Sequence, residues 1–384
     1  MRSGPEIPLD SRAAREVYLD WNATTPPHAE VLAAMAEAVR VAWGNPASVH
    51  GTGRRASALV EDARQSIAEL VARDARDVIL TSGGTEANNL ALAGARALVT
   101  SRLEHPSVTR VAESLEARGV PVCWLPVPEH GRVDPEAVER GLAPLGPGTL
   151  VALAAVNHET GVLQPIADVA RVAHAAGALL HVDAVQALGR VACELEGADT
   201  LSLAAHKLRG PKGIGALVAR PGKPPAPVLF GGAQERGLRP GTVDAVAAAG
   251  FGVAARLART GSVRYARLGE LRDSVERALA GSVRVNGGGV PRAPHVTNFS
   301  TLGLRGDELA AALDLEGVRV SSGSACSAGT SEPSKVIEAM LGRERASSAL
   351  RVSLGELTTS AEIARFLEAF QLVLARARKG SSSA

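Results

Sequence analysis

The chain has 384 residues, of which 46% are hydrophobic and 21% charged, with 42 lysines and arginines against 40 acidic residues. This length allows two domains and a sizeable core, and the balanced charge gives no sign of a nucleic-acid or membrane-surface binder. No apolar stretch is long enough to cross a bilayer, and the polar N-terminus does not read as a secretory signal.

The first two-thirds of the chain predict an α/β fold. A helix expected at 31–43, a Gly/Pro/Ser loop and an amphipathic helix expected at 57–72 precede a series of short apolar strands. The strands are expected at 77–81, 98–101, 122–125, 150–156, 179–182, 200–203 and 214–218, with helices that include 82–93, 106–118 and 166–176. Apolar strands that alternate with helices indicate a mostly parallel sheet covered on both faces.

The pattern changes after about residue 250 and predicts a smaller α+β domain. The expected elements are a helical stretch at 251–280 broken at Gly261, strands at 296–300 and 350–353, helices at 307–316 and 361–378, and a Ser/Gly loop that starts at residue 321. We expect a large cofactor-binding domain, 21–255, and a small domain, 256–384, and in addition an N-terminal segment, 1–20, that joins the small domain.

Three cysteines, Cys123, Cys193 and Cys326, lie far apart and form no CxxC pair. Their number and spacing argue against a disulfide framework and against a metal site, so we expect a cytoplasmic protein without a bound metal. Cys326 lies among serines, glycines and alanines, where a thiol is accessible and can act as a nucleophile. The simpler alternative is an incidental surface cysteine.

Lys207 ends the stretch LSLAAHK, which precedes a Gly/Pro turn. Desolvation at the end of an apolar strand disfavours a charged amine, and a neutral amine can form a Schiff base with an aldehyde cofactor such as pyridoxal phosphate. A lone lysine there is more often a surface residue before a turn. The residues that follow the other strands therefore decide between the two interpretations.

Polar residues follow most of the expected strands, at the edge where parallel sheets bind ligands. The set comprises Gly84, Thr85, His105, Asn157, His158, Asp183, Gln186 and His206. Gly84 and Thr85 open a helix and make a plausible phosphate cup, although a plain tight turn is equally compatible. Singly, the others read as loop or cap residues, but together they predict a cofactor site, in which Asp183 suits a pyridinium nitrogen.

In order and spacing, these segments resemble the cysteine desulfurases of the NifS/IscS type, in the class V aminotransferase branch of fold-type I pyridoxal-phosphate enzymes. The resemblance extends from about residue 18 to the last helix. The matching segments are YLDWNATTP, GNPASVHGTGRRA, TSGGTEANNLA, EH, NHETG, HVDAVQ, HKLRGPKGIGAL, GGAQERGLRPGT, SSGSACSAGTSEPS and LRVSLG.

The resemblance implies roles around the cofactor ring. Lys207 would be the Schiff-base lysine, and His105 would lie over the ring and assist proton transfer. Asp183 would pair with the ring nitrogen, and Gln186 and Asn157 would reach the phenolic oxygen and the substrate.

The resemblance also implies how the phosphate is held. Gly84, Thr85 and His206 would bind it. Thr242 would reach the phosphate of a second subunit, which implies a homodimer with shared active sites.

The implied reaction converts L-cysteine to L-alanine. Arg351 would bind the substrate carboxylate, and Cys326 would form a persulfide and pass the sulfur to an acceptor protein, such as an iron–sulfur scaffold. A selenocysteine lyase or another class V enzyme is the alternative, and a non-catalytic regulator with this fold is a third.

Two positions depart from the pattern of the resembled family. Ala204 stands where many relatives carry a hydroxyl residue, which removes one expected phosphate contact. Arg209 stands where an uncharged residue is usual, and it could compensate for the lost contact.

Overall fold

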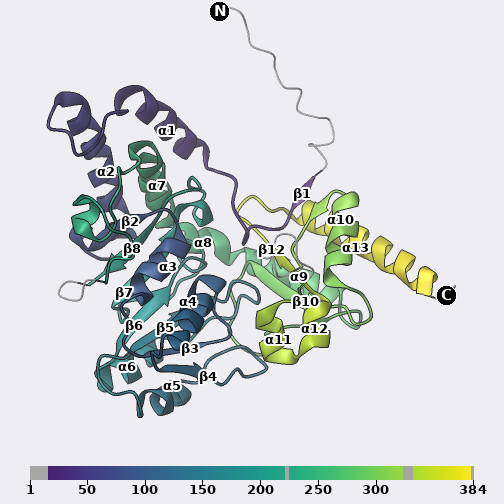
Figure 1. Ribbon diagram of the computed structural model, residues 1–384. Coiled ribbons are helices and arrows are strands. Elements are labelled where there is room, and N and C mark those ends of the chain that lie inside the picture. Colours follow the sequence, from purple (N-terminus) through teal and green to yellow (C-terminus); the bar gives the residue numbers. More distant parts are fainter. Residues whose placement is uncertain (1–15, 221–224, 323–331, 382–384) are drawn as a thin grey trace, which may run out of the picture.

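A computed structural model describes residues 16–220, 225–322 and 332–381. Its largest element is a seven-stranded sheet with the strand order β2-β8-β7-β6-β5-β3-β4 (Figure 1). The strands are β2 (Val78–Thr81), β3 (Leu98–Ser101), β4 (Val122–Leu125), β5 (Leu150–Ala154), β6 (Leu179–Asp183), β7 (Thr200–Ala204) and β8 (Gly215–Ala219). The expected α/β class with a mostly parallel sheet is confirmed.

Strand β8 runs antiparallel to both of its neighbours, β2 and β7, whereas the remaining neighbouring pairs are parallel. The chain enters β8 from a turn that follows Lys207 rather than from a crossover helix, and a turn can join only antiparallel strands. Strands β2, β6 and β7 consequently end at the same edge, where the residues after them meet.

Helices cover both faces of this sheet. They are α2 (Gly51–Leu70), α3 (Gly84–Leu92), α4 (Pro106–Ala117), α5 (Pro135–Leu142), α6 (Ile166–Ala175) and α7 (Ala245–Ala258), while α1 (Ala29–Val41) packs on α2 and α7. Within β2, Val78 and Leu80 pack in the largest apolar cluster, while Ile79 packs in a separate cluster with Leu90 of α3. Alternate residues thus face opposite layers, which explains why the strand is apolar throughout.

Helix α2 begins at Gly51, so the sequence-based expectation of a loop up to residue 56 is wrong. His50 caps this helix, because its Nδ1 accepts a hydrogen bond from Gly53 N at 3.2 Å. A Cβ atom at Gly53 would lie 2.2 Å from the Ser48 carbonyl oxygen. The glycines that suggested a loop instead permit this close approach at the start of the helix.

The C-terminal part surrounds a second apolar cluster. Its elements are α8 (Gly261–Ala266), α9 (Leu268–Ala278), β9 (Arg284–Val285), β10 (Val296–Ser300), α10 (Gly306–Leu315), β11 (Val318–Arg319), α11 (Lys335–Leu341), α12 (Arg343–Ser347), β12 (Ala349–Ser353) and α13 (Ser360–Ser381). Strand β10 pairs in antiparallel fashion with β9 and β12, and the Phe299 and Phe370 rings meet edge to face at 5.6 Å.

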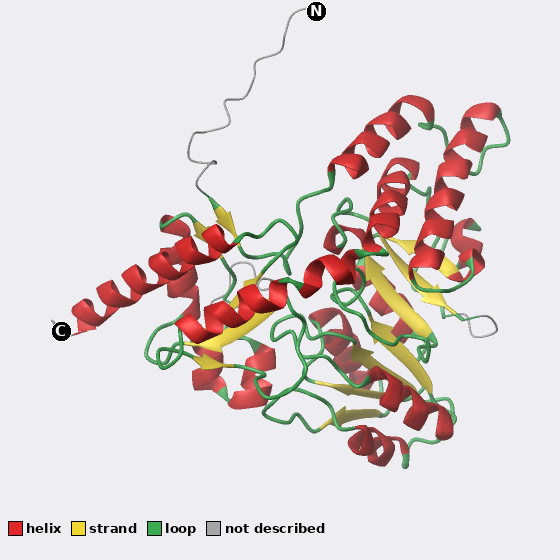
Figure 2. Cartoon of the chain, turned by 180° about the vertical axis from the view of Figure 1, so that it is seen from behind, coloured by secondary structure: helices red, strands yellow, loops and turns green. Residues whose placement is uncertain are grey.

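The N-terminal strand β1 (Val17–Tyr18) pairs in parallel with β11, and Val17 and Leu19 pack in the second cluster. The chain then crosses to the large sheet, and helices α7, α8 and α9 lead back to the second cluster. The view from behind shows a helix that bridges the two parts (Figure 2). The expected domain limits at residues 20 and 255 remain predictions.

Within the described residues, no helix is long and apolar enough to cross a membrane. The same residues contain no group of three or more histidine, cysteine or acidic side chains placed to hold a metal ion.

Candidate active site

Lys207 lies directly after β7, in the short 3-10 helix Ala205–Lys207 at the carboxyl edge of the sheet. Its Nζ donates hydrogen bonds to the Asn22 carbonyl and, at 2.8 Å, to the Ala23 carbonyl. The neighbouring Thr25 Oγ1 donates to the His206 carbonyl at 2.7 Å. The segment that joins the second cluster to the large sheet therefore passes over the lysine and holds its amine at this edge.

Asp183 ends β6 as a buried carboxylate. Its Oδ2 accepts a hydrogen bond from Asn88 Nδ2 at 2.8 Å, and its Oδ1 accepts one from Val185 N at 3.0 Å. Asn88 lies on α3, and its Oδ1 is 3.0 Å from His181 Nε2. These donors hold the carboxylate in one orientation, and a carboxylate so held can bind a protonated ring nitrogen.

His105 precedes α4 and caps it, because its Nδ1 accepts a hydrogen bond from Ser107 N at 3.1 Å. Its ring meets the His158 ring edge to face at 5.2 Å. Burial lowers the pKa of His105; Asp183 opposes this effect and Lys207 adds to it. Burial also lowers the pKa of His158 well below its usual value. Both imidazoles are therefore neutral near pH 7, and His105 can accept a proton.

Gly84 opens helix α3 beside the ends of two central strands. A Cβ atom at this position would lie 2.8 Å from Val185 Cγ2 and 3.6 Å from Ala204 Cβ. The absence of a side chain thus brings the helix N-terminus, with its outward N–H groups, against the segment after β6 and the end of β7. Thr85 is exposed and lines, together with His105, a hollow of about 590 Å³.

Gln186 and Asn157 are buried, and neighbouring groups already bind their amides. Gln186 Oε1 accepts from an Arg190 guanidinium nitrogen at 2.5 Å, and its Nε2 donates to the Asn22 carbonyl at 3.0 Å. Asn157 Nδ2 donates to the Leu103 carbonyl at 2.8 Å, and its Oδ1 accepts hydrogen bonds that shape the loop after β5. Their contacts with a cofactor and a substrate remain predictions.

Arg351 lies in the middle of β12 and is 3% exposed. Its guanidinium forms an ion pair with Asp20 at 2.7 Å and donates to the His158 carbonyl at 3.1 Å, while its Nε has no partner in the described part of the chain. The second cluster thus presents a cation to the loop beside His105. A buried guanidinium with an unpaired Nε fits the predicted recognition of a carboxylate.

The remaining predicted residues lie in different settings. His206 Nδ1 is 3.1 Å from Thr24 Oγ1, and burial, with a smaller effect of Lys207, lowers the pKa of His206 to about 4. Thr242 is exposed in the loop before α7. Cys326 lies outside the described residues, so its role as a nucleophile remains a prediction.

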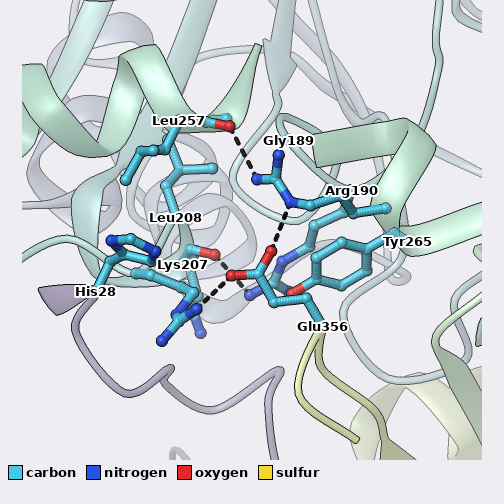
Figure 3. Close-up of a pocket in the computed structure, with 11 residues that line it drawn as sticks. His28, Gly189, Arg190, Lys207, Leu208, Leu257, Tyr265 and Glu356 are labelled. Carbon is cyan, nitrogen blue, oxygen red and sulfur yellow. Dashed lines mark hydrogen bonds and ion pairs between the residues drawn. The ribbon is translucent and has the colours of Figure 1, made fainter. Parts of the chain in front are cut away.

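Arg209 has a partner other than a phosphate. Its guanidinium pairs with Glu356, whose second carboxylate oxygen lies 2.8 Å from Arg264 Nε, around a small cavity of about 20 Å³ beside Lys207 (Figure 3). This arrangement does not support the idea that Arg209 compensates for Ala204. The cavity is also too small to hold a cofactor.

Sequence reasoning assigned no role to three residues that contact the site, namely Asp20, Asn22 and Arg190. Asp20 and Asn22 lie in the matching segment YLDWNATTP, which could have drawn attention to them. Arg190 had no such signal, because it follows the segment HVDAVQ and its partners are brought together only by the fold.

Known proteins resemble this chain in sequence and in fold. The sequence matches the family described as aminotransferase class-V over residues 17–366. A cysteine desulfurase of Cereibacter sphaeroides is 42% identical over 367 residues, which cover 92% of this chain and 94% of that protein. A solved NifS-like protein has a TM-score of 0.85 at 31% identity and covers 94% of this chain and 99% of its own. The structure titled SspA in complex with cysteine has a TM-score of 0.77 at 29% identity, with 89% and 99% coverage.

Proposed function

The chain belongs to the class V aminotransferase family, and we propose that it acts as a pyridoxal-phosphate-dependent cysteine desulfurase. The relative from Cereibacter sphaeroides, which is 42% identical across nearly the whole chain, carries that name. The observation that carries the proposal is the convergence of Lys207, Asp183 and a neutral His105 at one sheet edge, with Arg351 presented from the second cluster.

The donor set at this edge fits pyridoxal phosphate. Lys207 would carry the aldehyde, Asp183 would bind the ring nitrogen, and Gly84, Thr85 and His206 would bind the phosphate. When bound, the cofactor supplies an electron-withdrawing ring that makes the Cα–H bond of an attached amino acid acidic. The close approach that Gly84 permits toward Val185 and Ala204 supports this assignment, because it places helix N–H groups beside the strand ends.

Arg351 would orient the substrate. Its guanidinium is fixed by Asp20 and by the His158 carbonyl, so it would bind a carboxylate without first being ordered. The side chain of the amino acid would then be held in one direction relative to Lys207.

Proton transfer at Cα would use Lys207 or His105. A general base must be unprotonated and close to its proton, and burial keeps the His105 imidazole neutral. The ring of His158, which lies 5.2 Å from that of His105, is neutral as well and adds no positive charge that would hinder protonation of His105.

Sulfur would leave the substrate by attack of the Cys326 thiolate on the substrate sulfur. A sulfur–sulfur bond forms and the carbon–sulfur bond breaks, and its electron pair stays with the substrate carbon, which takes up a proton and becomes the methyl group of alanine. Cys326 then carries a persulfide, whose outer sulfur passes to a thiol acceptor, for example on an iron–sulfur scaffold protein.

A homodimer with shared sites would complete the phosphate contacts through Thr242. In the arm made of α1 and α2, the loop that joins the two helices carries large exposed apolar side chains, Trp43 at 74% and Val49 at 88% exposure, and Phe230 is 88% exposed in the stretch before α7. Exposed apolar groups of this size favour association with another surface, and Thr242 is itself exposed near Phe230 in sequence.

The test is a product assay of the purified protein with L-cysteine and a thiol reductant. We expect alanine and sulfide in equal amounts, and neither product from Lys207→Ala. Much faster turnover of L-selenocysteine would replace the proposal with a lyase. A protein that retains no cofactor and forms no alanine would support the non-catalytic alternative.

A further inference from the structure

Arg190 is a fully buried arginine at the back of the site, with 1% of its surface exposed. Its guanidinium donates to Asn22 Oδ1 at 3.0 Å, to Gln186 Oε1 at 2.5 Å, to the Trp21 carbonyl at 3.2 Å and to the Lys207 carbonyl at 2.7 Å. Figure 3 shows the last of these bonds. None of the four acceptors is a carboxylate.

A buried cation without a carboxylate partner is costly, because it loses its hydration and gains only neutral acceptors in return. Burial lowers the pKa of Arg190, and Tyr265, whose ring centre lies 5.9 Å from the guanidinium carbon, is a further partner that raises this pKa less strongly. An apolar side chain would fill the same space at lower cost. The reason for an arginine at this position must therefore lie in the four groups that accept its hydrogen bonds.

The four acceptors come from three separate segments, and each segment carries a group of the site. The Asn22 carbonyl accepts from the Lys207 amine, Gln186 follows the strand that ends in Asp183, and the last acceptor is the main chain of Lys207 itself. One guanidinium thus connects the three chain segments that surround Lys207.

The same contact settles how the Gln186 amide is oriented. A guanidinium donates and cannot accept, so the amide oxygen must face Arg190 and the NH₂ group must face the other way. That NH₂ group donates one hydrogen to the Asn22 carbonyl at 3.0 Å, on the same atom that the Lys207 amine contacts. Gln186 is therefore presented to the surroundings of the lysine as a donor.

We propose that Arg190 is a positioning residue, which fixes Gln186 as a hydrogen-bond donor toward the phenolic oxygen of the cofactor and holds the main chain of Lys207. This inference rests on the proposed function, because it needs the cofactor to be bound at Lys207. The relevant property is the protonation of the bound cofactor, since a donor to its phenolic oxygen stabilises the form that has lost a proton.

The experiment is a pH titration of the visible absorption of the cofactor-loaded protein. Arg190→Lys keeps the charge but loses the fork of donors, so we expect its midpoint to rise by about one pH unit, the effect of one lost hydrogen bond. Gln186→Glu keeps a partner for Arg190 but removes the donor and adds a negative charge, so it should raise the midpoint by at least as much. In the double variant the two shifts should not add, because both act through one amide.

The matched control is Arg272→Lys. Arg272 is also mostly buried and donates to a main-chain carbonyl, that of Ala293 at 2.8 Å, but it lies in the small-domain part of the chain. We expect this variant to titrate like the wild type. Thermal unfolding of each variant shows separately whether the fold is retained.

Three results would overturn the inference: an unchanged midpoint in Arg190→Lys, additive shifts in the double variant, or an unchanged midpoint in Gln186→Glu. The last result does not depend on whether Arg190 variants fold. Formation of alanine and sulfide by the wild type tests the proposed function on its own, so a wild type that is active but whose variants do not shift contradicts only the role of Arg190.

Discussion

Burial controls the charge of the residues around Lys207. It lowers the pKa of His105 and of His158, and it raises the pKa of Glu104 to about 8 and that of Glu159 to about 7. Near neutral pH the two imidazoles are thus neutral and Glu104 keeps its proton, whereas Glu159 is near the midpoint of its titration. Few ionised side chains from this group therefore surround the residues that have a binding role in our account, such as Asp183 and Arg351.

Glu104 makes stability depend on pH. Its folded-state pKa of about 8 exceeds the ordinary 4.5, so the folded protein keeps a proton that the unfolded chain loses. Its contribution to stability is fully present below about pH 4.5 and is lost as the pH rises through about 8. Glu104→Gln keeps acceptance from Ala154 N and removes the titration.

We therefore expect the wild type to lose a few kcal/mol more free energy of unfolding than Glu104→Gln between about pH 5 and about pH 8. Urea unfolding at both pH values measures this difference. The titration of Glu159 contributes equally to the loss in both proteins, so it cancels from the difference between them. Equal losses in the two proteins would show that Glu104 is ionised in the fold.

His105 can be tested apart from its capping role. Asparagine is also a good N-cap, so His105→Asn should keep α4 and the thermal midpoint while it removes the imidazole. If His105 moves the Cα proton, alanine formation should slow by about 10²- to 10⁴-fold while the cofactor stays bound. Wild-type turnover in this variant would assign the proton transfer to Lys207 alone.

The site residues at the carboxyl edge of the sheet could be predicted, because the sequence shows where apolar strands end. Lys207 and Asp183 follow β7 and end β6, as expected. Their hydrogen-bond partners could not be predicted, because Asn88 and Arg190 reach them only through the packing of α3 and of the turn after β6.

At the scale of elements, the apolar strand pattern predicted the strands of the sheet well. The glycines before residue 57, in contrast, led to the wrong prediction of a loop where α2 begins. Gly53 permits a close approach to the Ser48 carbonyl, and this contact is invisible in the local sequence. The reversed direction of β8 was also not expected. It follows from the turn after Lys207, which brings β8 back beside β7.

The Arg209–Glu356 pair joins the turn after Lys207 to the loop after β12. Both side chains are mostly buried, at 14% and 10% exposure, and Arg264 binds the same carboxylate. Arg209 has a φ of +62°, in the left-handed region that arginine rarely adopts, and Thr25 Oγ1 accepts from its N–H at 3.0 Å. The pair thus connects the lysine segment with the strand that carries Arg351.

Glu356→Gln should lower the free energy of unfolding by about 2–4 kcal/mol, because it leaves two arginines without their carboxylate. It should also raise the KM for cysteine more than it lowers kcat, because Arg351 would no longer be held at a fixed position relative to Lys207. Asp62→Asn, which breaks an exposed pair with Arg256, is the control and should change stability by less than about 1 kcal/mol. Similar losses in both variants would contradict a special role for Glu356.

At the scale of the molecule, the second apolar cluster is built from strands that are far apart in the sequence. The pairing of β1 with β11, between Val17 and Val318, could not come from local periodicity. The expectation that residues 1–20 join the small domain came from the family resemblance instead. The same resemblance is the source of the dimer, which the exposed apolar arm supports.

Trp43→Asp tests the dimer. We expect the wild type to have twice the chain mass in sedimentation or light scattering, and Trp43→Asp to shift toward the monomer and to bind the cofactor less tightly. Leu315→Asp, at an apolar position of α10 that is more exposed than Trp43, should leave the mass unchanged. A monomeric wild type would contradict shared sites and the role of Thr242.

The central claim is that Cys326 takes sulfur from L-cysteine, and mass spectrometry of its peptide tests it most directly. The wild type is mixed with L-cysteine without reductant, digested under conditions that preserve persulfides, and assayed for alanine in the same sample. We predict one added sulfur atom on the Cys326 peptide, one alanine per site, and no added sulfur on Cys123 or Cys193. Alanine without sulfur on Cys326, or full sulfide release by Cys326→Ala, would contradict the account.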